Sequence, residues 1–498
     1  MQPGNNLSQQ KLPDLPRQLS NLLDFNNART WWILYAAAVV SFLPALAFYY
    51  VGEEAIHPIV ALEMWYRGEW LQQPLYGLYL KRNPLFHWLV IFFANFFGWE
   101  QVLSVARGIT ISATVLSGIV AAWLARKLYR DNAFAAFTAL IYLTLEDVFF
   151  YRGWLAYVDP LFALLVFSSI ACLWVATLEK RAGLLWLGTI ALFGAFMTKA
   201  LTAYVFYSVA VMVMAFRQEN LRFFLRPGSL LPHLLAVAAP VLWLTWVTGG
   251  GQQSIMVSEI LLKFSPGSLP AYAKQLLTFP FLILAHLLPW SLVILYWARG
   301  RHLNPIASES PQLTTAFWII GLNFIPYWIA PHSHPRYILP LHPLFALILA
   351  YLMWGLGDQV KTLAMRVFVA VLALKLIFVI VAFPYYQRHY RGENYEVAAR
   401  EILHRTEGHQ LYSSYFGSSG LNVTAYLDIF RLPQAPLTFP PAQWESGFVL
   451  AHTPDPALGR IAEQYRLGAE NLYLLCRGSA CSTGNDNNSW SSKPFNSR

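Results

Sequence analysis

Residues 51–85 read VGEEAIHPIVALEMWYRGEWLQQPLYGLYLKRNPL and directly follow an apolar, aromatic-flanked segment. The stretch opens on the paired carboxylates Glu53 and Glu54 and closes on Lys81 and Arg82, followed by Asn-Pro. Its middle, residues 55–66, has the apolar spacing of a helix that lies along a membrane surface. A polar loop with both signs of charge beside a membrane span is where we expect the chemistry of this chain.

The composition of the whole chain is that of a membrane protein. Of the 498 residues, 56% are hydrophobic and 12% are charged, whereas soluble domains carry about 25% charged residues. The mean hydropathy is +0.42. Apolar runs of about span length recur from residue 31 to residue 384, and helices satisfy their own backbone hydrogen bonds in lipid. The predicted fold class is therefore a polytopic α-helical membrane protein.

The apolar runs predict eleven transmembrane helices. They cover residues 31–50, 105–125, 133–150, 160–177, 184–198, 201–216, 230–247, 279–297, 314–330, 338–354 and 367–383. A further apolar run, residues 84–97, is short for a hydrocarbon layer about 30 Å thick. We therefore expect that run to lie in the interface, within one large outer loop, residues 51–104.

The placement of Lys and Arg predicts the orientation of the chain. With the N-terminus inside, the cytoplasmic segments hold fifteen of these residues and the opposite short loops hold nine, as the positive-inside rule requires. Residues 1–30 then form a cytoplasmic lead and residues 31–384 a transmembrane domain. The tail, residues 385–498, emerges on the outer face, and its short apolar runs and helical patterns predict a small α/β domain with a frayed end after Cys481.

The formal net charge of +9 invites a nucleic-acid interpretation, but the basic residues sit mostly in short loops between spans. The positive-inside rule explains them without a nucleic-acid partner. The three cysteines are too few for a disulfide framework. Cys476 and Cys481 lie close together in the tail and can form a bridge if the tail faces an oxidising compartment.

Several charged residues fall at the predicted outer ends of spans. Asp159 opens a span before a proline, which alone is an ordinary helix-start signal. Lys199 lies in the turn between two apolar helices. Arg336 and Tyr337 lie in a short loop with two histidines. These histidines lack the spacing of metal ligands on a helix, and no third ligand is evident in the sequence.

The charged side chains of residues 51–85 also have simple structural interpretations. The pair Glu53-Glu54 suits the N-terminal dipole of a surface helix as solvated loop acids. The pair Lys81-Arg82 suits snorkelling cations beside an interfacial helix, or else a site for the phosphate of a lipid headgroup.

Together these motifs resemble those of the membrane glycosyltransferases of the GT-C fold. The chain is most similar to the bacterial lipid A aminoarabinose transferase type, which is related to protein O-mannosyltransferases. That family has an Asp-Glu pair opening the first outer loop, Glu-Lys-Pro-Pro-Leu closing it, and Arg-Tyr, two apolar residues and Pro at a late span. Residues 53–54, 81–85 and 336–340 match these motifs, and Asp159, Lys199, 263–264 and 289–290 follow in the family order.

The resemblance implies a sugar donor linked to polyprenyl phosphate, transfer with inversion at the outer face of a bacterial inner membrane, and a membrane lipid or other periplasmic acceptor. Glu53, Glu54 and Asp159 are then candidates for activating or positioning the acceptor. General-base help of this kind contributes about 10²–10⁴-fold. The candidates for holding the lipid phosphate are Lys81, Arg82, Lys199, Lys263, Arg336 and Tyr337, with Arg107 as a further candidate.

The sequence departs from the family pattern at two places. The leading Asp is Glu53, and the acidic residue of the Glu-Lys-Pro-Pro motif is absent. The aminoarabinose transferases bind a structural metal through that acid and a later His, where this chain has Ile260. We therefore expect no metal or other cofactor, and the acceptor need not be lipid A.

Two alternatives to a glycosyltransferase remain open at the level of the sequence. One is a transporter or flippase of a lipid-linked substrate, although such a protein would have charges at midplane and repeat symmetry. The other is a scaffold whose site has decayed, suggested by the change at Glu53.

Overall fold

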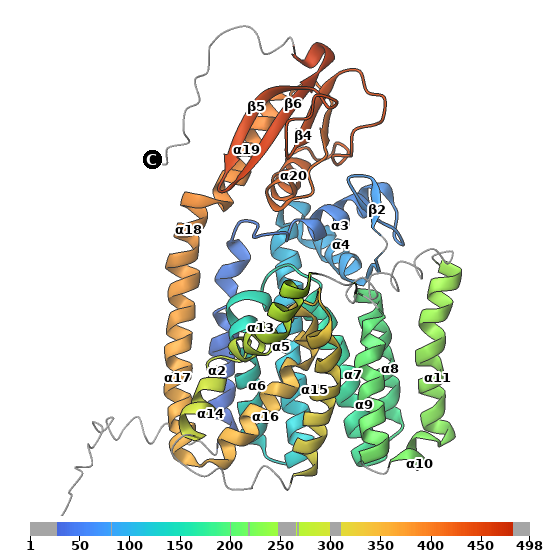
Figure 1. Cartoon of the computed structure of the whole chain (residues 1–498), viewed down its shortest axis with the longest axis vertical. Helices are drawn as coiled ribbons and strands as arrows, with labels where there is room; N and C mark the ends of the chain where they lie inside the picture. The colour runs from blue at the N-terminus through green and yellow to red at the C-terminus, as the bar shows by residue number, and fades with distance from the viewer. Residues whose placement is uncertain are drawn as a thin grey trace, which may run out of the picture.

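The computed structural model of the chain describes residues 27–80, 82–199, 201–217, 220–247, 265, 268–298 and 310–481. These residues form a bundle of long helices with a small mixed domain at one end (Figure 1). Within them, six helices are long and apolar enough to cross a membrane, or seven if the bent pair α13–α14 is one span, and four apolar helices are shorter. The predicted fold class is confirmed, and the number of eleven spans stays a prediction.

The bundle is built from short and long helices in chain order. Its elements are α2 (Ala28–Val40), η1 (Leu43–Ala47), α5 (Val102–Tyr129), α6 (Asn132–Leu143), η3 (Asp147–Arg152), α7 (Asp159–Glu179), α8 (Gly183–Thr198), α9 (Thr202–Arg217), α10 (Leu221–Phe224), α11 (Pro227–Leu242), η4 (Trp243–Val247), α13 (Leu269–His286), α14 (Trp290–Ala298), α15 (Pro311–Ile329), η6 (Pro335–Leu341), α16 (His342–Gly355), α17 (Asp358–Ile377) and η7 (Phe378–Ala382).

The centre of the bundle is α6. Every residue from Ala133 to Leu143 is buried, as expected for a helix that is apolar on all sides. Its start is fixed by Asp131, whose carboxylate accepts hydrogen bonds from the backbone N–H groups of Ala133 and Phe134, because a side-chain cap satisfies donors that the first turn leaves free.

The outer loop contains α3 (Ile56–Arg67), the hairpin β1 (Gln73–Leu75) and β2 (Leu78–Leu80), α4 (Leu85–Phe97) and η2 (Trp99–Gln101). Tyr76 and Gly77 connect the two strands with φ of 56° and 77°, which a two-residue hairpin turn of the primed type requires. Helix α4 buries one face and leaves Phe92, Phe96 and Phe97 exposed. An uncharged helix with a bare aromatic face suits the interfacial position predicted for residues 84–97.

The chain leaves the bundle through a long helical run. Helices α17, η7, α18 (Phe383–Tyr390) and α19 (Gly392–Arg405) follow one another within the segment Asp358–Arg405, drawn in orange in Figure 1. The predicted domain boundary after residue 384 therefore falls inside α18.

The C-terminal domain, residues 392–481, joins helices to a four-stranded sheet, as predicted for the tail. It contains α19, β3 (Leu411–Ser413), α20 (Ser418–Phe430), β4 (Gly447–Ala451), β5 (Arg460–Leu467), β6 (Glu470–Arg477) and η8 (Gly478–Cys481). The strand order is β3-β4-β6-β5, with β3 parallel to β4 and the other pairs antiparallel. Cys476 and Cys481 form a disulfide, which confirms the predicted bridge. The predicted frayed end after Cys481 lies outside the described residues.

The C-terminal domain is hydrogen-bonded to the outer loop. The backbone N–H of Phe439 donates to the carbonyl of Tyr76 at 2.8 Å, and the Tyr76 hydroxyl donates to the carbonyl of Tyr415 at 3.1 Å. The side-chain amide of Asn422 donates to the carbonyl of Gly52 at 3.1 Å. The domain therefore fixes both the beginning of the outer loop and its hairpin.

Candidate active site

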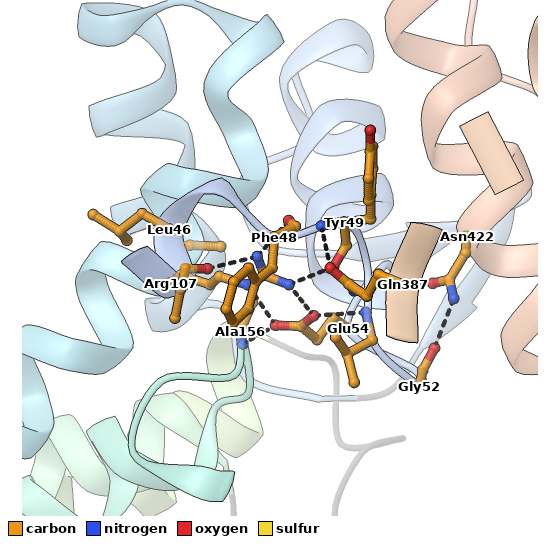
Figure 2. Close-up of polar contacts among 12 residues, drawn as sticks. Leu46, Phe48, Tyr49, Gly52, Glu54, Arg107, Ala156, Gln387 and Asn422 are labelled. Carbon is orange, nitrogen blue, oxygen red and sulfur yellow. Dashed lines mark hydrogen bonds and ion pairs between the residues drawn. The ribbon is translucent and has the colours of Figure 1, made fainter. Parts of the chain in front are cut away.

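The beginning of the outer loop is held by a buried ion pair between Glu54 and Arg107 (Figure 2). The guanidinium donates from Nε to Oε1 at 3.0 Å and from Nη2 to Oε2 at 2.6 Å. The backbone N–H groups of Ala156 and Val51 donate to the same carboxylate at 2.6 Å and 2.8 Å. Four hydrogen bonds fill the acceptor capacity of a carboxylate, and Glu54 is fully buried.

Arg107 joins this carboxylate to the end of the first span. Its Nη1 atom donates to the carbonyls of Ala45 and Phe48, and its Nη2 atom donates to the carbonyl of Tyr49. The side chain of Gln387 brackets the Tyr49 backbone from the other side, through hydrogen bonds of 3.1 Å and 3.0 Å (Figure 2). These hydrogen bonds therefore fix the backbone at the point where the first span ends and the outer loop begins.

Glu53 differs from its neighbour because its side chain is exposed. It follows Gly52, whose φ of +58° lies in the left-handed region that favours glycine. The Tyr157 hydroxyl lies against this turn, and a Cβ atom at position 52 would stand 3.2 Å from it. The charge of Glu53 also acts on Arg336, which is the last of several effects on that guanidinium.

Asp159 and Lys199 form an ion pair. Asp159 is the first residue of α7 and Lys199 directly follows α8. Since α7 and α8 form an antiparallel hairpin, the start of one helix meets the end of the other. The ammonium nitrogen of Lys199 also lies 5.1 Å from the centroid of the Tyr337 ring, a cation–π distance. Three of the predicted site residues are thus brought together.

Arg336 lies beside this pair, with its guanidinium carbon 5.4 Å from the centroid of the Tyr337 ring. Its Nε atom is buried and has no hydrogen-bond partner among the described residues. The charge of Arg336 acts on Asp159. A buried donor without a partner costs free energy, so this guanidinium presents a binding capacity that an anion can satisfy.

The end of the outer loop approaches the same cluster. Arg82 is exposed, and its charge and that of Lys199 both act on His57. Asn83 is buried, donates to the carbonyl of Phe196 at 2.6 Å and accepts from the Trp243 indole at 3.3 Å. This anchor holds the basic end of the loop near the end of α8. Lys81 and Lys263, both predicted phosphate ligands, lie outside the described residues.

Sequence reasoning missed a pair of buried histidines under the cluster. The Nδ1 atom of His57 lies 3.2 Å from the Nε2 atom of His87, and both rings are buried. Burial first, and then the charges of Arg82 and Lys199, lower the pKa of His57 to about 3. A lone histidine in an apolar helix carries no sequence signal for such a pair, which arises only when α3 packs against α4.

A second polar cluster lies behind Asp159. The Nε atom of Arg152 donates to both carboxylate oxygens of Asp147, at 2.9 Å and 3.0 Å. Nδ1 of His286 lies 3.1 Å from Oε2 of Glu146 and 3.7 Å from Oδ1 of Asp147. The backbone N–H of Glu146 donates to the carbonyl of Leu288 at 2.8 Å, at the bend between α13 and α14. Among the described residues, no group of three or more His, Cys, Asp or Glu side chains has a metal-binding arrangement.

No protein-family model matches the chain. The undecaprenyl phosphate-alpha-4-amino-4-deoxy-L-arabinose arabinosyl transferase of Enterobacter sp. (strain 638) is 28% identical over 366 residues, which cover 68% of this chain and 63% of that protein. The enzyme of the same name from Yersinia enterocolitica is 26% identical over 341 residues, 66% of this chain and 58% of its own length. The matched region thus spans less than two thirds of these relatives.

The structure is similar to the crystal structure of ArnT from Cupriavidus metallidurans bound to undecaprenyl phosphate, with a TM-score of 0.67. The similarity covers 91% of this chain and 99% of that one, at 17% sequence identity, and therefore shows the fold. It extends over the bundle and the C-terminal domain alike. In sequence and in fold, the chain resembles the bacterial aminoarabinose transferases, which are membrane glycosyltransferases of the GT-C fold.

Proposed function

We propose that the chain is an integral membrane glycosyltransferase that moves a sugar from a polyprenyl-phosphate donor to a lipid or other acceptor, with inversion. The observation that carries this proposal is the gathering of Lys199 and Arg336 around Asp159, with the charges of Arg82 and Lys199 both acting on the neighbouring His57. The relatives are named as transferases of a sugar linked to undecaprenyl phosphate, and these names support a polyprenyl-phosphate sugar as the donor.

The basic cluster suits a departing lipid phosphate. When the bond between the sugar and the phosphate breaks, the phosphate oxygen gains negative charge, and fixed cations stabilise that charge without reorganising. Lys199 and Arg336 share the ring of Tyr337, which keeps both cations in place. The free Nε atom of Arg336 is the donor best suited to a phosphate oxygen. Lys81 and Lys263 belong to the same proposal through their motif positions.

The carboxylates suit the acceptor. An acceptor hydroxyl attacks the anomeric carbon from the face opposite the phosphate, the bond to the phosphate oxygen breaks, and the hydroxyl proton passes to a carboxylate. Glu53 is exposed and has the freer carboxylate, so we assign the proton to it. Asp159 is tied to Lys199 and orients that cation. Glu54 and Arg107 position the loop, because their hydrogen bonds are already satisfied within the protein.

The surroundings favour catalysis at the outer face of a bacterial inner membrane. The site lies at the end of the bundle that carries the C-terminal domain (Figure 1), and that domain holds a disulfide, which persists in oxidising compartments. No cofactor is part of the proposal, since the reaction needs only a carboxylate and fixed cations. A lipid A-like acceptor is one member of the proposed acceptor class.

The test uses purified full-length protein, a polyprenyl-phosphate-linked aminoarabinose and a membrane lipid extract. We expect release of polyprenyl phosphate together with a glycosylated lipid. Glu53→Gln and Asp159→Asn should each lower turnover by a factor of about 10² or more. Glu100→Gln, which changes an exposed acid elsewhere in the outer loop, should leave turnover unchanged.

Full turnover in both Glu53→Gln and Asp159→Asn would remove the catalytic assignment. Movement of the donor across liposome membranes without any transfer of its sugar would favour the flippase alternative instead. Binding of the donor without turnover, under conditions in which an authentic aminoarabinose transferase is active, would favour a scaffold.

A further inference from the structure

A polar cavity lies at the end of the bundle far from the C-terminal domain. It has a volume of about 880 Å³ and opens between the last turns of α5 and α7 and the first turns of α6 and α15. Arg107 and Arg126 both lie on α5 and are 19 residues apart, so at 1.5 Å per residue the cavity is about 28 Å along the helix from the Glu54–Arg107 pair. It is therefore separate from that site.

Three basic side chains line this cavity among the described residues: Arg126, Lys127 and Arg130. Lys127 is neutralised by Glu179, with 2.6 Å between the ammonium nitrogen and a carboxylate oxygen. Arg126 and Arg130 are four residues apart, both are exposed, and neither has a carboxylate within ion-pair distance among the described residues. Two guanidinium groups that have no ion-pair partner among the described residues therefore line the cavity.

The local backbone fixes the relative position of the two residues that carry these guanidinium groups. Arg130 ends α5 in the left-handed conformation, with φ of 58°, and its N–H donates to the carbonyl of Arg126 at 2.9 Å. The nearby acid Asp131 is engaged elsewhere, because its carboxylate caps α6. The turn therefore carries net positive charge, because Asp131 caps α6 and Glu179 pairs with Lys127.

The walls of the cavity are partly apolar. Trp123 and the half-exposed Leu178 stand beside the basic groups, and tryptophan is typical of the level of lipid headgroups. A free phosphate ion would use the guanidinium groups alone, whereas a phospholipid would use both parts of the wall. Basic pockets between transmembrane helices are typical binding sites for anionic headgroups.

We propose that this cavity binds the phosphate headgroup of an anionic membrane phospholipid, with Arg126 and Arg130 on the phosphate and Trp123 and Leu178 against the start of an acyl chain. The site is independent of the proposed transfer reaction. It places a structural lipid at the ends of α5 and α7, the two helices that carry Arg107 and Asp159 at their other ends.

The test compares the full chain with Arg126→Gln/Arg130→Gln in nanodiscs and by native mass spectrometry. Phosphatidylglycerol should be retained by the unaltered chain, and about thirtyfold more weakly by the double variant, since each basic group near an anionic lipid contributes a factor of about five. The matched control is Arg222→Gln/Arg226→Gln, another exposed pair of arginines four residues apart, which should retain the lipid normally. Phosphatidylcholine should be retained equally weakly by all three proteins.

Retention of phosphatidylglycerol by the double variant at the level of the unaltered chain overturns the proposal. An equal loss in the control also overturns it, because the effect is then one of total charge. Inorganic phosphate that raises the midpoint of thermal unfolding as much as phosphatidylglycerol overturns the lipid source. Transferase activity is measured separately, so its absence does not affect these outcomes.

Discussion

Arg107 donates hydrogen bonds to both carboxylate oxygens of Glu54, from Nε at 3.0 Å and from Nη2 at 2.6 Å, and neither side chain is exposed to solvent. One helix of the bundle thereby holds the first turn of the outer loop. Two adjacent acids, which look alike in the sequence, then have different surroundings. Glu54 is paired inside the protein, whereas Glu53 is exposed and is the acid that we propose acts on the substrate.

The first prediction concerns Glu54. Glu54→Gln should lower the free energy of unfolding by about 3–5 kcal/mol, because removing one partner leaves the other charge of a buried pair unpaired. Thermal unfolding in detergent, followed by tryptophan fluorescence, measures the change.

The contrasting variant for this prediction is Glu53→Gln. It should leave the unfolding midpoint unchanged, since exposed substitutions usually alter stability by less than about 0.5 kcal/mol, while turnover falls. Equal destabilisation by the two variants would contradict the division of roles between these acids.

The second prediction concerns the pair of Asp159 and Lys199. Lys199→Gln should raise the KM for the polyprenyl-phosphate donor, because it removes a cation from the proposed phosphate site. A double-mutant cycle with Asp159→Asn should give a coupling free energy of about 0.5–3 kcal/mol in stability. Strictly additive effects would show that the ion pair is not maintained in the membrane.

The third prediction concerns pH and the contact between the outer loop and the C-terminal domain. Burial raises the pKa of Glu63 from its ordinary value of 4.5 to about 7, although two backbone N–H groups and Arg67 oppose the rise. Burial also raises the pKa of Asp428, on α20, well above its ordinary value. In both cases the folded chain keeps a proton that the unfolded chain releases.

For Glu63, the stabilising contribution of the proton is complete below pH about 4.5 and is lost as the pH rises through about 7. For Glu63 the loss amounts to at most about 3 kcal/mol. The unfolding midpoint of the unaltered chain should therefore fall between pH 5 and pH 8, and the fall should be smaller in Glu63→Gln. Glu100→Gln serves as the control, and identical pH profiles for the unaltered chain and Glu63→Gln would rule out the assignment.

Much of this architecture was accessible from the sequence. The apolar runs gave the fold class, and the motif order placed Asp159, Lys199, Arg336 and Tyr337 in one family pattern. The structure brings these four together because α7 and α8 form a hairpin and η6 covers its open end. Local patterns sufficed here, since each residue lies at the end of an element that hydropathy defines.

The remainder depends on contacts between distant segments. The Glu54–Arg107 pair joins positions 53 residues apart, and the His57–His87 pair joins two helices. The attachment of Tyr76 to Tyr415 spans 339 positions. Neither hydropathy nor short motifs predict the partner of a buried polar group, because the partner is determined by the packing of whole helices and strands. A single sequence therefore showed which acids were present and not which one was already engaged.

The last prediction concerns the disulfide between Cys476 and Cys481. The bridge closes a short loop and joins β6 to η8, so it should stabilise the C-terminal domain by about 2 kcal/mol. Cys476→Ser/Cys481→Ser should make this domain more sensitive to limited proteolysis, whereas Cys172→Ser, at a free and half-buried cysteine in α7, should not.

Labelling with a thiol reagent tests the same bridge together with the compartment that the domain faces. Chain isolated from its native membrane and then denatured should label at Cys172 alone, and at all three cysteines after reduction. Because a disulfide of this kind persists only where the surroundings are oxidising, the result also reports on orientation. Labelling of Cys476 and Cys481 without reduction would show that the domain faces a reducing compartment, and the proposed outer-face chemistry would then have to be abandoned.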